Sequence, residues 1–226
     1  ELAAPLNHPP AGTLITLHPL PTHGGFMDSH VFKKAAYRLP ALADLAVLRF
    51  NLRGVSSPRG TSEGEFDFGN AERYDVSAAI EFADFHEQPK LVNKWLVGWS
   101  FGTDLALMHG LDPTIVGLIL LSPPLRFSQP EHLAAWADSG KPVVALIPEF
   151  DDYLRPDEAR ERFAAIPQAE VIAVAGAKHL WVGDPNVRRV QDEIVRRVNP
   201  AALPLARRWP AAEQRHEPKP RLKHAR

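Results

Sequence analysis

The sequence predicts an α/β fold in which a mostly parallel central sheet carries helices on both faces. Two observations lead to this prediction. Short apolar runs alternate with stretches of helical periodicity between residues 13 and 198, which is typical of successive β-α-β units. Several of these runs, such as LILL and VVALI, are apolar at every position, as strands buried on both faces require.

The expected elements follow from apolar patterns and from the residues at their ends. Pro40 is expected to end the first helix, and Pro156 is expected to begin the fifth one. The expected strands are residues 13–18, 45–50, 94–99, 115–122, 142–148 and 169–175. The expected helices are residues 28–39, 70–86, 100–109, 131–137, 156–165 and 186–198, and residues 51–69 are expected to form a loop.

We expect one domain over residues 1–199, followed by a tail over residues 200–226. The tail is rich in proline and basic side chains, and such a composition cannot bury a core. We therefore expect it to be flexible and solvated, with binding to a nucleic acid or another partner as the alternative. Its charged residues are Arg207, Arg208, Arg215, Lys219, Arg221, Lys223 and Arg226 against Glu213 and Glu217.

The composition excludes several classes of function. The formal net charge of −1 provides no field that would attract nucleic acid or an anionic membrane. No apolar run approaches the length of a membrane span. The chain has no cysteine, which excludes a cysteine nucleophile, a disulfide and a thiolate metal site.

The expected location is the cytoplasm. A sequence without cysteine fits a reducing compartment, and residues 1–10 lack the basic start and apolar stretch of a signal peptide. The chain begins at Glu1 rather than at a methionine, which leaves room for a preceding leader. The oligomeric state is left open by the sequence.

The segment GWSFG, residues 98–102, places Ser100 between an expected strand and an expected helix. This is the setting of a G-x-S-x-G nucleophile elbow, a tight turn that lifts the serine hydroxyl above the sheet. Gly98 and Gly102 would remove side chains that clash in such a turn. The helix that follows directs free N–H groups towards negative charge beside the serine. Ser100 is therefore the candidate nucleophile.

A serine nucleophile needs a base that is oriented by an acid. In this architecture an acid and then a histidine follow later strands, so the acid is expected after residue 148 and the base after residue 175. His179 is the candidate base, because no other histidine lies between the last strand and the last helix. For the acid the segment PEFDDYLRP offers Glu149, Asp151 and Asp152. We favour Asp151, three residues past the end of the strand, with Asp152 as the alternative.

Donors for an oxyanion are expected at two backbone positions. The N–H of Phe101 is one candidate. The loop HPLPTHGG supplies the other, because Pro19 and Pro21 have no N–H and leave Leu20 as the donor between them. Gly24 and Gly25 allow this loop to turn close to a substrate.

The remaining candidates concern metals and apolar contacts. His18 and His23 lack the further ligands that a metal site needs, so no metal or cofactor is expected, and His18 is expected to fix the loop by hydrogen bonds. Trp99 and Trp181 each neighbour a candidate catalytic residue. They are expected either to form an apolar wall for substrate or to pack in the core.

Over residues 13–198 the chain resembles the α/β-hydrolase superfamily, and within it the small bacterial serine hydrolases without a lid. Those proteins have an HPHP…GG loop, an RFNFRGVG…EGEFD segment and a G-x-S-F-G elbow. The corresponding stretches here are HPLPTHGGFMDSHVF, RFNLRGVSSPRGTSEGEFD, GWSFG and GAKHLW. The resemblance implies the α/β-hydrolase fold, a triad of Ser100, Asp151 and His179, and an oxyanion hole formed by Leu20 and Phe101.

The sequence departs from that pattern in three places. Leu20 replaces the second histidine of HPHP, SSPRGT lengthens the loop before SEGEFD, and Pro148 stands where a glycine usually precedes the turn with the acid. Fewer than about twenty residues separate Ser122 from Pro142, which leaves no room for a cap domain.

The expected function is hydrolysis of a small ester-like acyl substrate through an acyl-enzyme on Ser100. An acyltransferase or a peptidase would use the same triad, and a hydrolase-like binding protein without turnover is a further alternative. The natural substrate is not indicated by the sequence.

Overall fold

The computed structural model describes residues 1–207 and places seven strands in one sheet, in the order β1-β3-β2-β6-β7-β8-β9. All neighbouring strands run parallel except β1, which pairs antiparallel with β3. The strands are β1 (Leu2–Ala3), β2 (Gly12–Leu17), β3 (Leu45–Arg49), β6 (Lys94–Trp99), β7 (Ile115–Leu121), β8 (Val143–Phe150) and β9 (Ala169–Lys178). A small hairpin, β4 (Ser56–Ser57) and β5 (Gly60–Thr61), lies within the expected loop.

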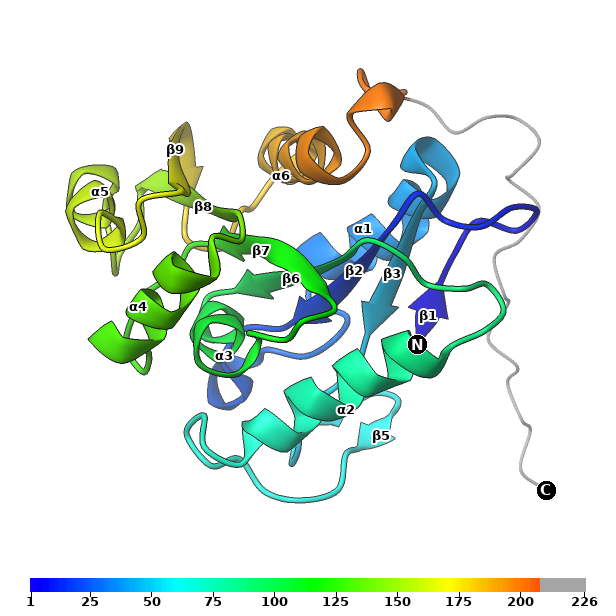
Figure 1. Ribbon diagram of the computed structural model, residues 1–226, viewed down its shortest axis with the longest axis horizontal. Coiled ribbons are helices and arrows are strands. Elements are labelled where there is room, and N and C mark those ends of the chain that lie inside the picture. Colours follow the sequence, from blue (N-terminus) through cyan, green and yellow to red (C-terminus); the bar gives the residue numbers. More distant parts are fainter. Residues whose placement is uncertain (208–226) are drawn as a thin grey trace.

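Helices cover both faces of this sheet, as the sequence predicts (Figure 1). One face is covered by α1 and α6, and the other by α2, α3 and α4, with α5 beside β8 and β9. The helices are α1 (His30–Ala43), α2 (Glu72–Phe85), α3 (Phe101–His109), α4 (Pro130–Ser139), α5 (Pro156–Phe163) and α6 (Asp184–Val198). Two short 3-10 helices, η1 (Pro21–His23) and η2 (Pro200–Ala202), complete the described elements. Over residues 1–207 the arrangement is an α/β-hydrolase fold without a cap domain.

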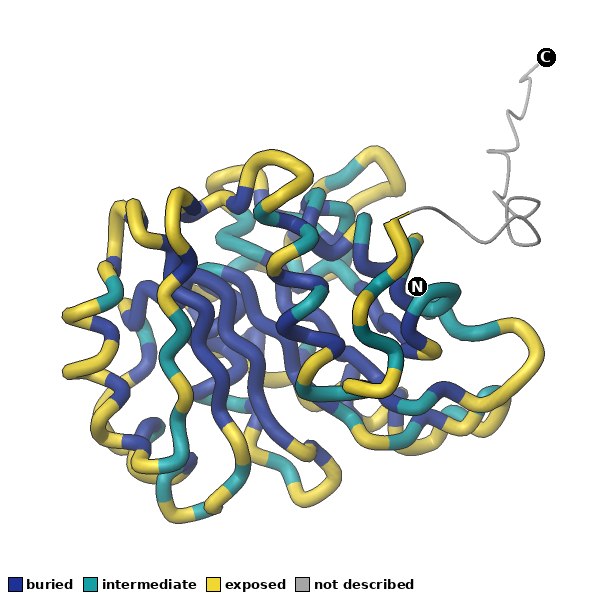
Figure 2. The backbone as a smooth tube through the Cα atoms, turned by 90° about the horizontal axis from the view of Figure 1, so that it is seen from above, coloured by how far each residue is buried: buried dark blue, intermediate teal, exposed yellow. Residues whose placement is uncertain are grey.

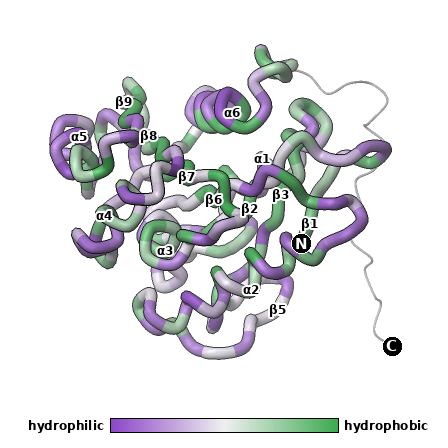
Figure 3. The backbone as a smooth tube through the Cα atoms, viewed as in Figure 1, coloured by the Kyte–Doolittle hydropathy of each residue, from purple (hydrophilic) through white to green (hydrophobic). Residues whose placement is uncertain are grey.

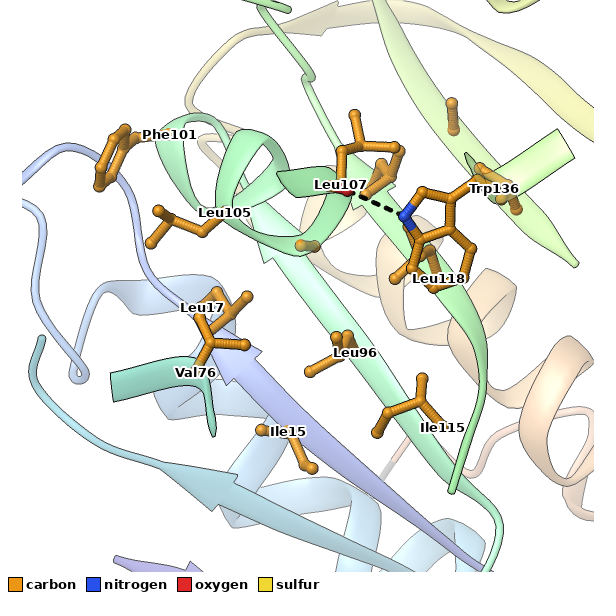
Figure 4. Close-up of a cluster of buried hydrophobic side chains, with 14 of the residues drawn as sticks. Ile15, Leu17, Val76, Leu96, Phe101, Leu105, Leu107, Ile115, Leu118 and Trp136 are labelled. Carbon is orange, nitrogen blue, oxygen red and sulfur yellow. Dashed lines mark hydrogen bonds between the residues drawn. The ribbon is translucent and has the colours of Figure 1, made fainter. Parts of the chain in front are cut away.

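The central strands are buried on both faces, which explains their unbroken apolar runs (Figure 2). In β2, for example, Ile15 and Leu17 join the cluster under α2 and α3, whereas Leu14 joins the cluster under α1 and α6. Figure 4 shows the first cluster, where the Trp136 indole N–H donates a hydrogen bond to the Leu107 carbonyl over 3.0 Å. Hydrophilic residues are concentrated on the helices and loops around the sheet (Figure 3).

Several element boundaries differ from the prediction by a few residues. Helix α1 continues through Pro40 to Ala43. Leu39 and Ala43 are both buried on its inner face, so packing outweighs the hydrogen bond that proline removes. Strands β8 and β9 extend to Phe150 and Lys178, because these two residues pair beyond a register shift.

The domain also extends past its predicted end at residue 199. Ala202, Leu203 and Leu205 pack against the cluster under α1 and α6, because these apolar side chains still reach the core. The rest of the predicted tail, residues 208–226, lies outside the described residues, so the expectation that it is flexible stays a prediction.

Candidate active site

The candidate residues follow four strands that end at one edge of the sheet. Successive strands are added outward in one direction from β2 to β3 and in the other from β6 to β9, so the strand order reverses between β2 and β6. Ligands of open α/β sheets bind at the carboxyl ends of the strands, near such a reversal. Leu20 follows β2, Ser100 follows β6, Asp151 follows β8 and His179 follows β9.

Ser100 occupies a strained turn between β6 and α3. Its backbone has φ 52° and ψ −120°, a region that residues with a side chain rarely adopt. A Cβ atom on Gly98 would lie 2.5 Å from the Gly102 carbonyl oxygen, and one on Gly102 would lie 2.0 Å from the Leu17 carbonyl oxygen. The expectation that both glycines avoid clashes is therefore confirmed. The second distance also shows that the chain entering the HPLPTHGG loop packs directly against the elbow.

A chain of hydrogen bonds joins Ser100, His179 and Asp151. The Ser100 hydroxyl lies 2.9 Å from His179 Nε2, and His179 Nδ1 lies 2.9 Å from Asp151 Oδ2. The pairing of Phe150 with Lys178 explains the second contact, because Asp151 directly follows Phe150 and His179 directly follows Lys178. The arrangement allows the imidazole to take a proton from the hydroxyl while the carboxylate faces the opposite nitrogen.

The other two acidic residues lie elsewhere. Asp152 is exposed, and the Glu149 carboxylate accepts a hydrogen bond from the Gly176 N–H over 2.7 Å. Within residues 1–207, Asp151 is the one acidic residue of this segment that contacts His179.

The Asp151 carboxylate is held in its charged form by hydrogen bonds. Burial raises its pKa, but the bonds from His179 and from the N–H groups of Tyr153 and Leu154 outweigh this effect. The resulting pKa lies below the ordinary value of an aspartate. A carboxylate that stays charged can both orient an imidazole and stabilise its protonated form.

The backbone of His179 is fixed by two donors from the ends of β6 and β7. The indole Nε1 of Trp99 and the hydroxyl of Ser122 each donate a hydrogen bond over 3.1 Å to the His179 carbonyl oxygen. Ser122 itself has φ 50°, an unusual conformation at the end of β7. Ser122 was not among the residues predicted from the sequence, although its position directly after a buried strand was an available signal.

The two tryptophans lie in the core rather than on a surface. Trp99 is 2% exposed and Trp181 is 0% exposed, and both belong to the cluster under α1 and α6. Their side chains therefore have no solvent-facing area that could form the apolar wall considered above. The aromatic ring that does border the site is Tyr153, which packs edge-on against the His179 ring at 4.6 Å and is 53% exposed. Tyr153 was also missed by the sequence analysis.

The HPLPTHGG loop is fixed by His18, as expected. The Leu52 N–H donates to His18 Nε2 over 3.1 Å, so Nδ1 carries the proton and donates to the Pro19 carbonyl over 2.7 Å. The bond from Leu52 requires a neutral ring, because Nε2 can accept only without a proton, and burial lowers the pKa of His18 to about 4.

The same loop turns tightly after Leu20. The N–H groups of His23 and Gly25 both donate to the Leu20 carbonyl. Gly25 is buried, and a Cβ atom there would lie 2.0 Å from the Pro19 carbonyl oxygen, whereas Gly24 is exposed and has φ 82°. Within residues 1–207, neither the Leu20 N–H nor the Phe101 N–H donates to another group of the protein.

Among residues 1–207, no three His, Asp or Glu side chains are grouped as metal ligands would be. No helix in this range combines the length and apolar character needed to cross a bilayer.

Comparisons with known proteins agree with the geometry. The model of the alpha/beta hydrolase family matches residues 22–222. An α/β serine hydrolase homologue from Coxiella burnetii is 26% identical, with a TM-score of 0.71 over 86% of this chain and 88% of that one. An α/β serine hydrolase without a lid, from Xanthomonas campestris, is 28% identical, with a TM-score of 0.63 over 79% and 78%.

A third structure shows the fold alone. The Pyrococcus furiosus esterase is 19% identical, with a TM-score of 0.61 over 76% of this chain and 74% of that one. A search of curated protein sequences found no match. Since the family model covers most of the sequence, this chain belongs to the alpha/beta hydrolase family.

Proposed function

We propose that the protein hydrolyses small ester-like acyl substrates through an acyl-enzyme on Ser100. The observation that carries this proposal is the hydrogen-bond chain from Ser100 Oγ through the His179 ring to Asp151, with 2.9 Å at each link. A hydroxyl, an imidazole and a carboxylate in this order are the groups that serine nucleophiles require.

The reaction proceeds in two halves. His179 Nε2 takes the Ser100 proton as Oγ attacks the carbonyl carbon, and Asp151 stabilises the imidazolium that forms. The tetrahedral intermediate collapses when His179 gives the proton to the leaving oxygen, and the alcohol departs. Water then attacks the acyl-enzyme, with His179 again as base, and the acid is released. No cofactor takes part.

The oxyanion is assigned to the backbone N–H groups of Leu20 and Phe101. Both are free to donate to a ligand, and the start of the HPLPTHGG loop lies against the elbow at Gly102. The neutral His18 and the flanking prolines hold this loop in place before substrate arrives. Donors arranged in advance lower the barrier because they need no reorganisation during the reaction.

The substrate is assigned to short acyl esters. Only α4 and short connections lie between β7 and β8, so the described part of the chain provides no cap to enclose a long acyl chain. Its border is built by loops and by the half-exposed ring of Tyr153. The cytoplasmic location expected from the sequence stays a prediction.

A fluorophosphonate probe tests the nucleophile. The wild type should be labelled, Ser100→Ala should not, and circular dichroism should show that the variant is folded. An unlabelled wild type, or equal labelling of folded Ser100→Ala, would remove the proposed mechanism.

A series of p-nitrophenyl esters from acetate to laurate tests the substrate class. We expect kcat/KM to be highest for the short esters and to be lost in His179→Ala. A maximum at laurate would contradict the short-acyl assignment. Faster transfer of the acyl group to an added alcohol than to water would replace hydrolysis by acyl transfer.

A further inference from the structure

A cavity of about 400 Å³ lies on the side of the molecule covered by α1 and α6, apart from the candidate active site. It is bordered by α1, by α6 and by the segment after η2, and Figure 1 shows this segment running beside α6. The polar side chains that line it are Arg38, Arg188, Gln191, Arg207, Asp184 and Asp192. None of them belongs to the site described above.

The side chains that line this cavity carry more positive than negative charge. Arg38, Arg188 and Arg207 make no ion pair with any carboxylate in residues 1–207. Asp184 is already neutralised by Lys34, whose Nζ lies 2.5 Å from its carboxylate. Three guanidinium groups therefore face one free carboxylate, that of Asp192. Burial, followed by the nearby Arg188, lowers the pKa of Arg38, and the opposing effect of Asp184 and Asp192 is smaller.

Gln191 adds an independent observation. Its side chain is 0% exposed, and within the described chain neither its amide nitrogen nor its amide oxygen has a hydrogen-bond partner. The Nε of Arg38 is buried and without a partner as well. Buried polar groups are nearly always paired, so unpaired ones beside a cavity indicate a missing partner. That partner must accept from Gln191 Nε2 and the arginines, and it must also donate to Gln191 Oε1.

We propose that this cavity binds a phosphate group, either inorganic phosphate or the phosphate of a monoester. Arginine forks suit phosphate oxygens because two parallel N–H groups can bind two of them. Near neutral pH, inorganic hydrogen phosphate keeps one P–OH group, and a monoester, whose second pKa is about 6, keeps one part of the time. The P–OH group supplies one donor, which can serve either Gln191 Oε1 or the Asp192 carboxylate. A carboxylate or a sulfate lacks this proton at neutral pH.

Thermal unfolding of the full chain tests the proposal, with phosphate, sulfate, acetate and NaCl compared at equal ionic strength. Phosphate should raise Tm by roughly 5–10 °C when it exceeds Kd about a hundredfold, with sulfate and acetate well below this. A phosphomonoester such as glycerol phosphate distinguishes the two sources of phosphate. If glycerol phosphate binds more tightly than inorganic phosphate, the ligand is assigned as a monoester. The shift should persist in Ser100→Ala, so its outcome is independent of the proposed hydrolase activity.

Two variants assign the shift to the cavity. Gln191→Leu fills a similar volume without buried polar atoms, and Arg188→Gln removes one guanidinium; both should abolish most of the phosphate shift. Arg189→Gln is the matched control, because Arg189 lies next along α6 but pairs with Glu193. A phosphate shift no larger than that of NaCl, or an equal shift in Gln191→Leu, would overturn the proposal. Sulfate or acetate acting as strongly as phosphate would overturn the role of the P–OH group.

Discussion

The indole Nε1 of Trp99 donates a hydrogen bond to the His179 carbonyl over 3.1 Å. The residue that precedes Ser100 on the chain therefore also anchors the loop that carries His179. Ser122 donates to the same carbonyl from the end of β7. The distance between the hydroxyl and the imidazole is thus set by rigid strands rather than by the loop alone, which is the support that a preorganised site needs.

Ser122→Ala should lower kcat with little change in KM. It removes one of two donors to the His179 carbonyl, and a hydrogen bond contributes about 1 kcal/mol, which corresponds to roughly a fivefold loss of rate. Trp99→Phe should act similarly, since it removes the other donor and keeps an aromatic ring in the core. Ester hydrolysis kinetics measure both effects. Ser77→Ala, on the exposed face of α2, is the control, and equal kinetics in all three variants would show that the anchor is unimportant.

Asp151→Asn should reduce kcat by about 10⁴-fold, because an amide cannot stabilise the imidazolium and favours the wrong tautomer. Asp152→Asn should leave kcat within about twofold of the wild type, as this side chain is exposed and its change lies in the ±0.5 kcal/mol range of surface substitutions. Steady-state assays of the two purified variants compare them directly. The assignment fails if Asp152→Asn is the variant that loses turnover.

Gly102→Ala should destabilise the protein by about 3 kcal/mol or more, because its Cβ would lie 2.0 Å from the Leu17 carbonyl oxygen. Gly140→Ala is the control: it has φ 65° and no atom within 4 Å of the added Cβ, so only the backbone conformation is penalised, by about 1 kcal/mol. Urea unfolding gives both values. Similar losses in the two variants would mean that the elbow relaxes around the added methyl group.

Acid should destabilise the protein through His18. Its pKa is lowered to about 4 by burial, from 6.5 in an unfolded chain, so the unfolded state binds an additional proton between these values. The contribution of neutral His18 to the free energy of unfolding is therefore fully present above pH 6.5. It decreases by about 3 kcal/mol as the pH falls towards 4.

His18→Asn should be less stable than the wild type at pH 7, since it loses the acceptor for the Leu52 N–H. Its unfolding free energy should also depend less on pH between 6.5 and 4. Urea unfolding at several pH values measures both curves. Parallel curves would show that His18 does not carry the acid sensitivity.

Local sequence patterns were sufficient to predict the fold class and the loops that carry the candidate site. Alternating strand and helix patterns and fully apolar strands such as ILL and VVALI leave few architectures that bury both faces of a sheet. The glycines of GWSFG, and the order of Ser100, the acidic segment and His179, are local signals of the same kind. Such signals are readable because they depend on neighbours a few residues apart.

The side chains that meet at the site could not be predicted from local patterns, because their contacts depend on strand register and packing. Asp151 rather than Asp152 faces His179 because Phe150 pairs with Lys178, and this register follows a shift within β8 and β9. Ser122 and Trp99 reach the His179 carbonyl across 57 and 80 positions of the chain. Pro40 stays inside α1 because of what Leu39 and Ala43 bury. Contacts between distant segments depend on packing, which no local pattern encodes.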